Sequence, residues 1–121
     1  MLRLSALLSI ALAAAPVLAT AQVTGIDVRP SAERVDVVVR ASEPLTFQSW
    51  ARSAPPVLVV DLLETAAEPR MIPQSALHGA ASLTGIEVSR HDARGVALSR
   101  LSLSLSKNVD SSVRSFIIYV R

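Results

Sequence analysis

Apolar and polar residues alternate along most of this 121-residue chain with a period of two, which is typical of β-strands. The alternation is clearest over 33–41, where three valines share one face, and over 101–106, where leucine and serine alternate. A continuous apolar, β-branched run over 56–63 is typical of a central strand buried on both faces. The pattern therefore predicts an all-β protein.

Seven strands can be placed from this pattern. We predict strands over 23–29, 33–41, 45–51 and 56–63, then one from Leu83, one through 101–105 and a last one over 113–121. Residues 64–82 hold Pro69, Pro73 and Gly79 and have no sustained period, so we expect a connection there, with a short helical turn around 74–77. Val96 and Leu98 have the opposite parity to Leu101, which calls for a β-bulge or a late strand start near 99–100.

A five-residue motif occurs twice. Thr24-Gly25-Ile26-Asp27-Val28 returns as Thr84-Gly85-Ile86-Glu87-Val88, and each copy opens a run of alternating residues. Neither half is long enough to bury a core alone, so the two should pack around one shared core. We therefore expect a β-sandwich of about seven strands, built from two similar halves over 23–63 and 83–121 and related by a pseudo-twofold axis.

The first 21 residues have the features of a cleaved signal peptide. Arg3 is followed by an apolar stretch over 4–15, Pro16 ends that stretch, and Ala19-Thr20-Ala21 fits the small-residue rule for cleavage. The apolar stretch is shorter than the roughly 20 residues that span a bilayer. We therefore expect a signal peptide over 1–21, a mature domain over 22–121, and a periplasmic location.

The amino-acid composition excludes several classes of function. Loss of Arg3 leaves 11 basic and 10 acidic side chains, and the arginines are dispersed among acids without the basic stripe that nucleic-acid binding requires. After the signal, no apolar stretch is long enough to cross a membrane. The chain has no cysteine, so thiol chemistry and cysteine-based zinc sites are excluded, and we expect no cofactor and no metal.

The inventory of catalytic residues is thin. His78 and His91 are the only histidines, and neither belongs to an H-E-x-x-H motif. His91-Asp92 is either an oriented base or a polar pair in a turn. Asp61, at the end of an apolar run, either binds an amine or pairs with backbone N–H groups or an arginine. Glu64 and Glu68 fit a solvated connection, so we expect no enzymatic activity.

The best candidate for a ligand-binding surface lies on the third strand. Its alternation turns Phe47 inward and places Thr46, Gln48 and Trp50 on the outward face, close to Arg52. An indole ring stacks on sugar faces, and an arginine fork suits carboxylates. The alternative is that Trp50 caps the end of the sandwich and buries most of its ring.

Five segments of the chain also follow one another in a recognisable order. They are Gly25–Val28, Arg34–Val38, Pro44–Phe47, Pro55–Leu62 and Arg100–Leu103. In this order the chain resembles the amidase N-terminal (AMIN) domain over nearly all of its mature length, although Val57 stands where that family often has a basic residue.

The resemblance implies a β-sandwich and a non-catalytic role. AMIN domains occur in periplasmic amidases and in type IV pilus secretins, where they are implicated in holding the partner domain at peptidoglycan or at a defined site in the envelope. Two functions follow as expectations: a module that binds peptidoglycan, or a protein-interaction domain that docks through an exposed edge strand in a secretin or related envelope assembly.

Overall fold

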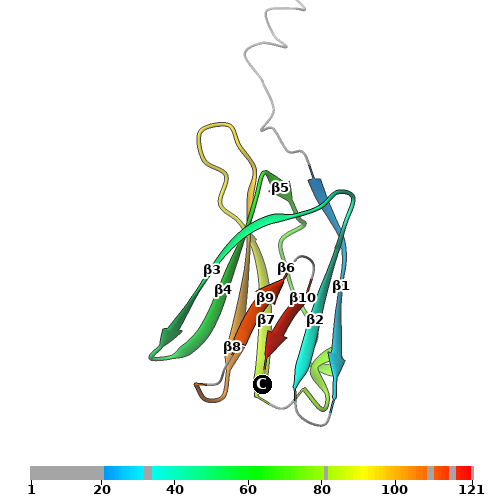
Figure 1. The fold of residues 1–121 in the computed structure, drawn as a ribbon, viewed down its shortest axis with the longest axis vertical. Helices are drawn as coiled ribbons and strands as arrows, with labels where there is room; N and C mark the ends of the chain where they lie inside the picture. The colour runs from blue at the N-terminus through cyan, green and yellow to red at the C-terminus, as the bar shows by residue number, and fades with distance from the viewer. Residues whose placement is uncertain (1–20, 32–33, 81, 109–110, 115–116, 121) are drawn as a thin grey trace, which may run out of the picture.

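The computed structural model describes residues 21–31, 34–80, 82–108, 111–114 and 117–120 and confirms the all-β sandwich (Figure 1). Residues 1–20, which make up all but the last residue of the expected signal peptide, lie outside the described residues. The described residues form ten strands and one 3-10 turn. These are β1 (Ala21–Pro30), β2 (Val35–Ala41), β3 (Thr46–Ser53), β4 (Pro56–Leu63), β5 (Thr65–Ala66), β6 (Arg70–Met71), η1 (Gln74–Leu77), β7 (Leu83–Arg90), β8 (Leu98–Leu105), β9 (Ser111–Arg114) and β10 (Ile117–Val120).

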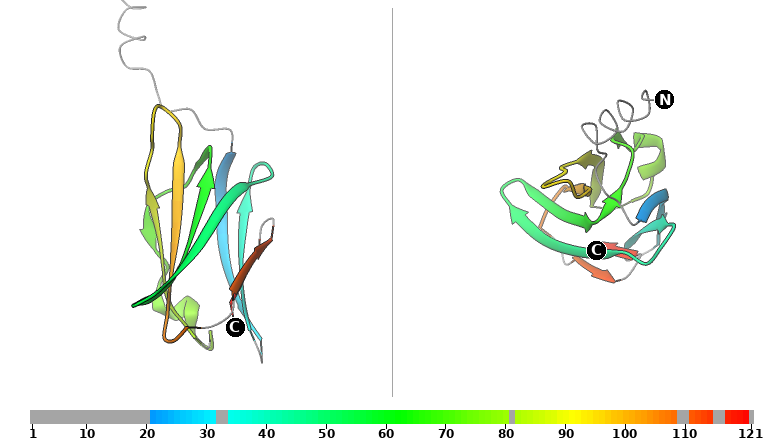
Figure 2. Two further views of the ribbon diagram at one scale, coloured as in Figure 1. Left: turned by 60° about the vertical axis from the view of Figure 1, so that its left-hand side comes forward. Right: turned by 90° about the horizontal axis from the view of Figure 1, so that it is seen from above.

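The strands form two five-stranded sheets that pack face to face. One sheet has the order β5-β1-β2-β10-β9 and the other the order β3-β4-β8-β7-β6. On one side of the sandwich, the connection between the halves links the two sheets, since β5 pairs with β1 and β6 pairs with β7 (Figure 2). The short helical turn expected over 74–77 is present as η1 in this connection.

The two halves of the chain share the sheets in a way that the repeat did not predict. Each half places its first hairpin in one sheet and its second hairpin in the other, so that β1-β2-β10-β9 has the same order as β7-β8-β4-β3. The pairing also matches: Ile26 lies opposite Val39 as Ile86 lies opposite Leu103. The expected pseudo-twofold relation is therefore present, but neither half forms a sheet of its own.

A β-bulge is repeated with the motif. Pairing shifts by one residue between Val23 and Gly25 in β1 and between Leu83 and Gly85 in β7, which leaves Thr24 and Thr84 as the extra residues. The extra residue changes the parity of the strand. In β7, Leu83 and Ile86 can therefore both face the core.

The core lies between the sheets and is made of aliphatic side chains from both. Val35, Val37 and Val39 of β2 are buried, as the alternation of that strand predicts. Leu101 and Leu103 of β8 are fully buried on the other sheet. The two inward faces cover each other and so remove these side chains from water. β4 is buried on both faces, as its continuous apolar run predicts, since Val59 on the outer side is also buried.

One expectation about the second half needs correction, and one alternative left open by the sequence is decided. The single last strand expected over 113–121 is a hairpin, in which β9 and β10 pair with each other and β10 also pairs with β2. With β5 and β6 this hairpin raises the strand count from about seven to ten. Of the two alternatives for the change of parity near 99–100, the structure supports the late strand start, since β8 begins at Leu98 and pairs with β4 without a shift.

Leu103 and Ser104 provide a direct test of the register of β8. Leu103 is fully buried, so Leu103→Ala should lower the free energy of unfolding by about 2–5 kcal/mol through lost burial and a cavity. Ser104 is exposed on the outer face, so Ser104→Ala should change it by less than about 0.5 kcal/mol. Chemical denaturation measures both, and equal losses would show that the assigned faces of β8 are wrong.

Candidate functional site

The four residues that the sequence singled out lie together on β3. Thr46, Gln48, Trp50 and Arg52 pair with Leu63, Asp61, Val59 and Val57 of β4. All four are exposed and point away from the core, whereas Phe47 between them packs against it. The structure therefore places the predicted residues on the outer face of one sheet, and Trp50 does not cap the core.

This outer face continues across β4 and β8. The register aligns residues from three strands into two adjacent rows, which are Trp50–Val59–Ser102 and Gln48–Asp61–Arg100. We refer to these six residues, together with Thr46 and Arg52, as the outer face.

An ion pair is built into the middle of the outer face. Arg100 donates from Nε to Asp61 Oδ1 at 2.7 Å and from Nη2 to Asp61 Oδ2 at 3.1 Å. Asp61 is only 2% exposed although it lies on the outer face, and its hydrogen bond raises the pKa of Arg100 above its ordinary value. The guanidinium therefore stays charged at any ordinary pH. Of the two roles that the sequence left open for Asp61, the structure supports the pairing with an arginine.

Arg100 also stacks on the aromatic ring. Its guanidinium carbon lies 5.3 Å from the centroid of the Trp50 ring, within the range of a cation–π contact. Asp61 thus holds Arg100, and Arg100 in turn contacts Trp50, which remains 40% exposed. This chain of contacts fixes an exposed indole ring on the same face as the polar side chains of Gln48 and Ser102.

The sequence did not identify Arg100 as part of this site. Arg52 was the arginine expected beside Trp50, but the arginine that contacts the ring is Arg100. Arg100 comes from a different strand and follows its partner Asp61 by 39 residues in the sequence. Asp61 ends the apolar run of β4, and Arg100 begins the alternating run of β8. If these two runs had been predicted to be neighbouring strands, Asp61 and Arg100 could have been placed opposite each other from the sequence.

The strand that carries Trp50 is also an edge of its sheet. β3 pairs along its eight residues with β4, and among the described strands no other pairs with it. The tip of the β3–β4 hairpin projects past the other sheet (Figures 1 and 2), and the inward-facing Ser49, Ala51 and Ser53 are exposed there.

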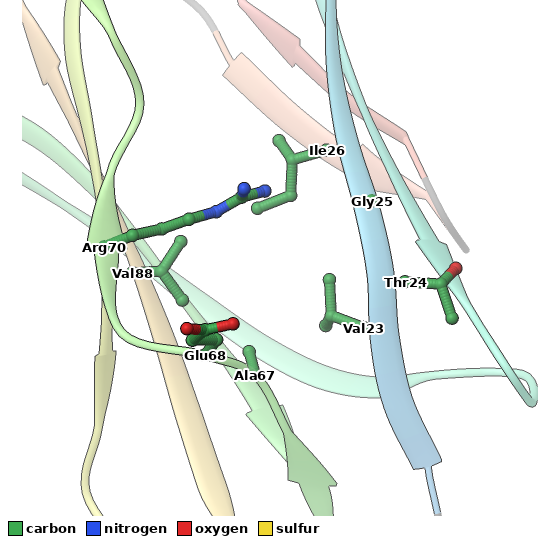
Figure 3. Close-up of a pocket in the computed structure, with 8 residues that line it drawn as sticks. All are labelled: Val23, Thr24, Gly25, Ile26, Ala67, Glu68, Arg70 and Val88. Carbon is green, nitrogen blue, oxygen red and sulfur yellow. The ribbon is translucent and has the colours of Figure 1, made fainter.

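A pocket of about 130 Å³ lies on a different side of the sandwich (Figure 3). One wall is the edge of β1 over Val23–Ile26, and the other is the connecting segment from Ala67 to Arg70. Its lining is mixed: Val88 from the opposite sheet adds an apolar side chain, while Glu68 and Arg70 bring charges. A wider pocket of about 440 Å³ adjoins it, and the two share Val23, Ala67 and Glu68.

The candidate catalytic residues do not assemble into a catalytic group. The Asp92 carboxylate accepts two hydrogen bonds from Arg90, at 3.0 and 2.8 Å, and one from the Leu98 N–H, so it does not orient His91. His91 Nε2 instead lies 2.9 Å from Ser89 Oγ. His91-Asp92 is therefore a polar pair in a turn. Glu64 lies in the turn after β4, and Glu68 lines the pocket.

Comparison with known proteins adds no relative: neither the family models nor the curated proteins include a match to this chain. Within the described ranges, no helix has the length and apolar character needed to cross a membrane. The same residues contain no group of three or more histidine or acidic side chains placed to hold a metal ion.

The Asp61–Arg100 pair should make a measurable contribution to stability. Arg100→Ala leaves a carboxylate that is 2% exposed without its partner, which should cost about 1–3 kcal/mol in the free energy of unfolding. Trp50 is the only tryptophan, so its fluorescence should also become easier to quench with acrylamide.

Arg52→Ala is the matched control, because Arg52 is exposed on the same face. It should change the free energy of unfolding by less than about 0.5 kcal/mol and leave quenching near that of the parent. If the two variants behave alike, Arg100 does not support Trp50.

Proposed function

We propose that this protein is a non-catalytic binding and localisation module of the periplasm, similar to an AMIN domain, and that it binds peptidoglycan. The observation that carries the proposal is the exposed ring of Trp50 on the outer face, held by the Asp61–Arg100 pair. The resemblance in the order of five sequence segments and the expected signal peptide over 1–21 support the location.

The chemistry of the outer face suits a glycan strand. Sugar rings stack their C–H faces on an indole, and hydroxyl and N-acetyl groups need hydrogen-bond partners close to the ring. Gln48 and Thr46 supply such partners from β3, and Ser102 supplies another from β8. Arg52, exposed beside Trp50, is suited to the carboxylates of the peptide stems.

A second candidate function rests on the edge of β3. An eight-residue edge strand without proline or an inserted bulge is a template for strand addition, and proteins usually protect such edges. This feature favours a protein-interaction domain of a type IV pilus secretin or related envelope assembly. The two functions differ in what they need: glycan binding needs the ring of Trp50, and strand addition needs the β3 backbone.

Co-sedimentation with purified sacculi tests the proposal. Trp50→Ala removes the stacking surface, so the fraction of protein that sediments should fall severalfold. Trp50 is 40% exposed and its loss removes a cation–π contact, so the melting temperature should drop by no more than about 8 °C. If the melting temperature instead falls sharply while binding per folded molecule is kept, Trp50 is structural and the β3 edge becomes the better candidate.

Arg52→Ala tests the charged part of the same contact. Binding should weaken and become less sensitive to added salt, because one screened charge contact is lost. Arg29→Ala is the control, since Arg29 is an exposed arginine on β1 of the other sheet. An equal loss of binding and of salt sensitivity in both variants would indicate attraction by net charge and no defined site on the outer face.

A further inference from the structure

The repeated motif has two copies with the same pairing but different neighbours on the open side of the strand. In the second copy, Arg70 and Met71 of β6 pair with Val88 and Glu87 of β7. The coverage continues through the Ile72 N–H, which donates to the Ile86 carbonyl at 2.9 Å. The edge of the second copy is therefore covered by the connection between the halves.

The first copy lacks such a cover. β5 pairs with β1 only at Ala21 and Gln22, and from Val23 onwards no described strand pairs with this edge. The 130 Å³ pocket opens along this uncovered stretch, at Val23–Ile26 (Figure 3). The unpaired backbone and the pocket therefore coincide at the repeated motif.

The side chain of Ile72 indicates what the pocket can hold. Ile72 lies beside Ile86, is 7% exposed and belongs to the hydrophobic core. In the first copy the corresponding place beside Ile26 is the pocket, which Val23, Ile26 and Val88 line with apolar side chains and which the Arg70 side chain enters from the other wall (Figure 3). A dry cavity of about 150 Å³ is large enough for benzene, so 130 Å³ is enough for one branched aliphatic side chain.

We infer that the uncovered edge of β1 at Val23–Val28 binds an extended segment of a partner protein, which adds to the sheet as residues 70–72 do on β7. One aliphatic side chain of that segment fills the pocket beside Ile26. An acidic group of the segment lies near Arg70 and a basic one near Glu68, which both line the pocket. This site is separate from the outer face and does not depend on glycan binding.

The chain itself supplies the probe. A peptide with the sequence of residues 69–75, with both ends blocked, is titrated into the ¹⁵N-labelled protein and followed by the backbone amide signals. We expect saturable shifts at 24–28. Replacing the isoleucine of the peptide with aspartate should weaken binding at least about tenfold, because a carboxylate is costly to bury against Val23, Ile26 and Val88 and is repelled by Glu68.

Two protein variants complete the test. Ala67→Leu places a larger side chain into the pocket and should remove the shifts at 24–28, whereas Trp50→Ala should leave them unchanged. Three results would overturn the inference: no shifts at 24–28, equal binding of the aspartate peptide, or shifts at 84–88 in place of 24–28. The last would mean that the peptide only displaces the chain's own segment from β7.

Discussion

Burial of one apolar face by another is the constraint on which this structure depends. A two-stranded hairpin is at best marginally stable in water, and each half of the chain is essentially two hairpins. Each half of the chain contributes one hairpin to each sheet, so both halves line the core from both sides. The crossing from β2 to β3 also moves the Trp50-bearing hairpin into the sheet of β8. Without that exchange, Trp50 and Arg100 would not lie on the same sheet.

The two halves of the chain share their strand order and pairing, but only one sheet has the Asp61–Arg100–Trp50 group. The pairing register makes Asp36 of β2 the counterpart of Arg100, and Tyr119 of β10 the counterpart of Asp61. Asp36 forms its ion pair with Arg34, a near neighbour in sequence, at 3.0 Å. The other sheet does have a cross-strand ion pair, between Arg40 of β2 and Asp27 of β1 at 3.1 Å, but it lies at a different position. The Asp61–Arg100 pair, and with it the support for an aromatic ring, therefore has no counterpart at the matching position among the described residues.

Alternation along the strands was enough to predict which side chains face the core. The parity of Val35–Val39, of Phe47 and of Leu101–Leu103 agrees with the structure, and so does the outward placement of Trp50. These properties depend only on the period of a strand. The choice of which strands pair depends on contacts between segments that are distant in the sequence. The exchange of hairpins and the Trp50–Arg100 contact were therefore not predicted. The bulges at Thr24 and Thr84 were not predicted, because both copies of the motif contain the extra residue at the same place. Comparing the two copies therefore shows no insertion.

The proposed function depends on a glycan contacting the outer face at Trp50. Because Trp50 is the only tryptophan, its emission reports on that face alone. The most direct measurement is a fluorescence titration of the protein with soluble peptidoglycan fragments that carry both sugars and peptide stems. We expect a saturable change in Trp50 emission and protection of the ring from acrylamide. Unchanged emission and quenching, under conditions in which the fragments are shown to bind, would contradict the proposed function.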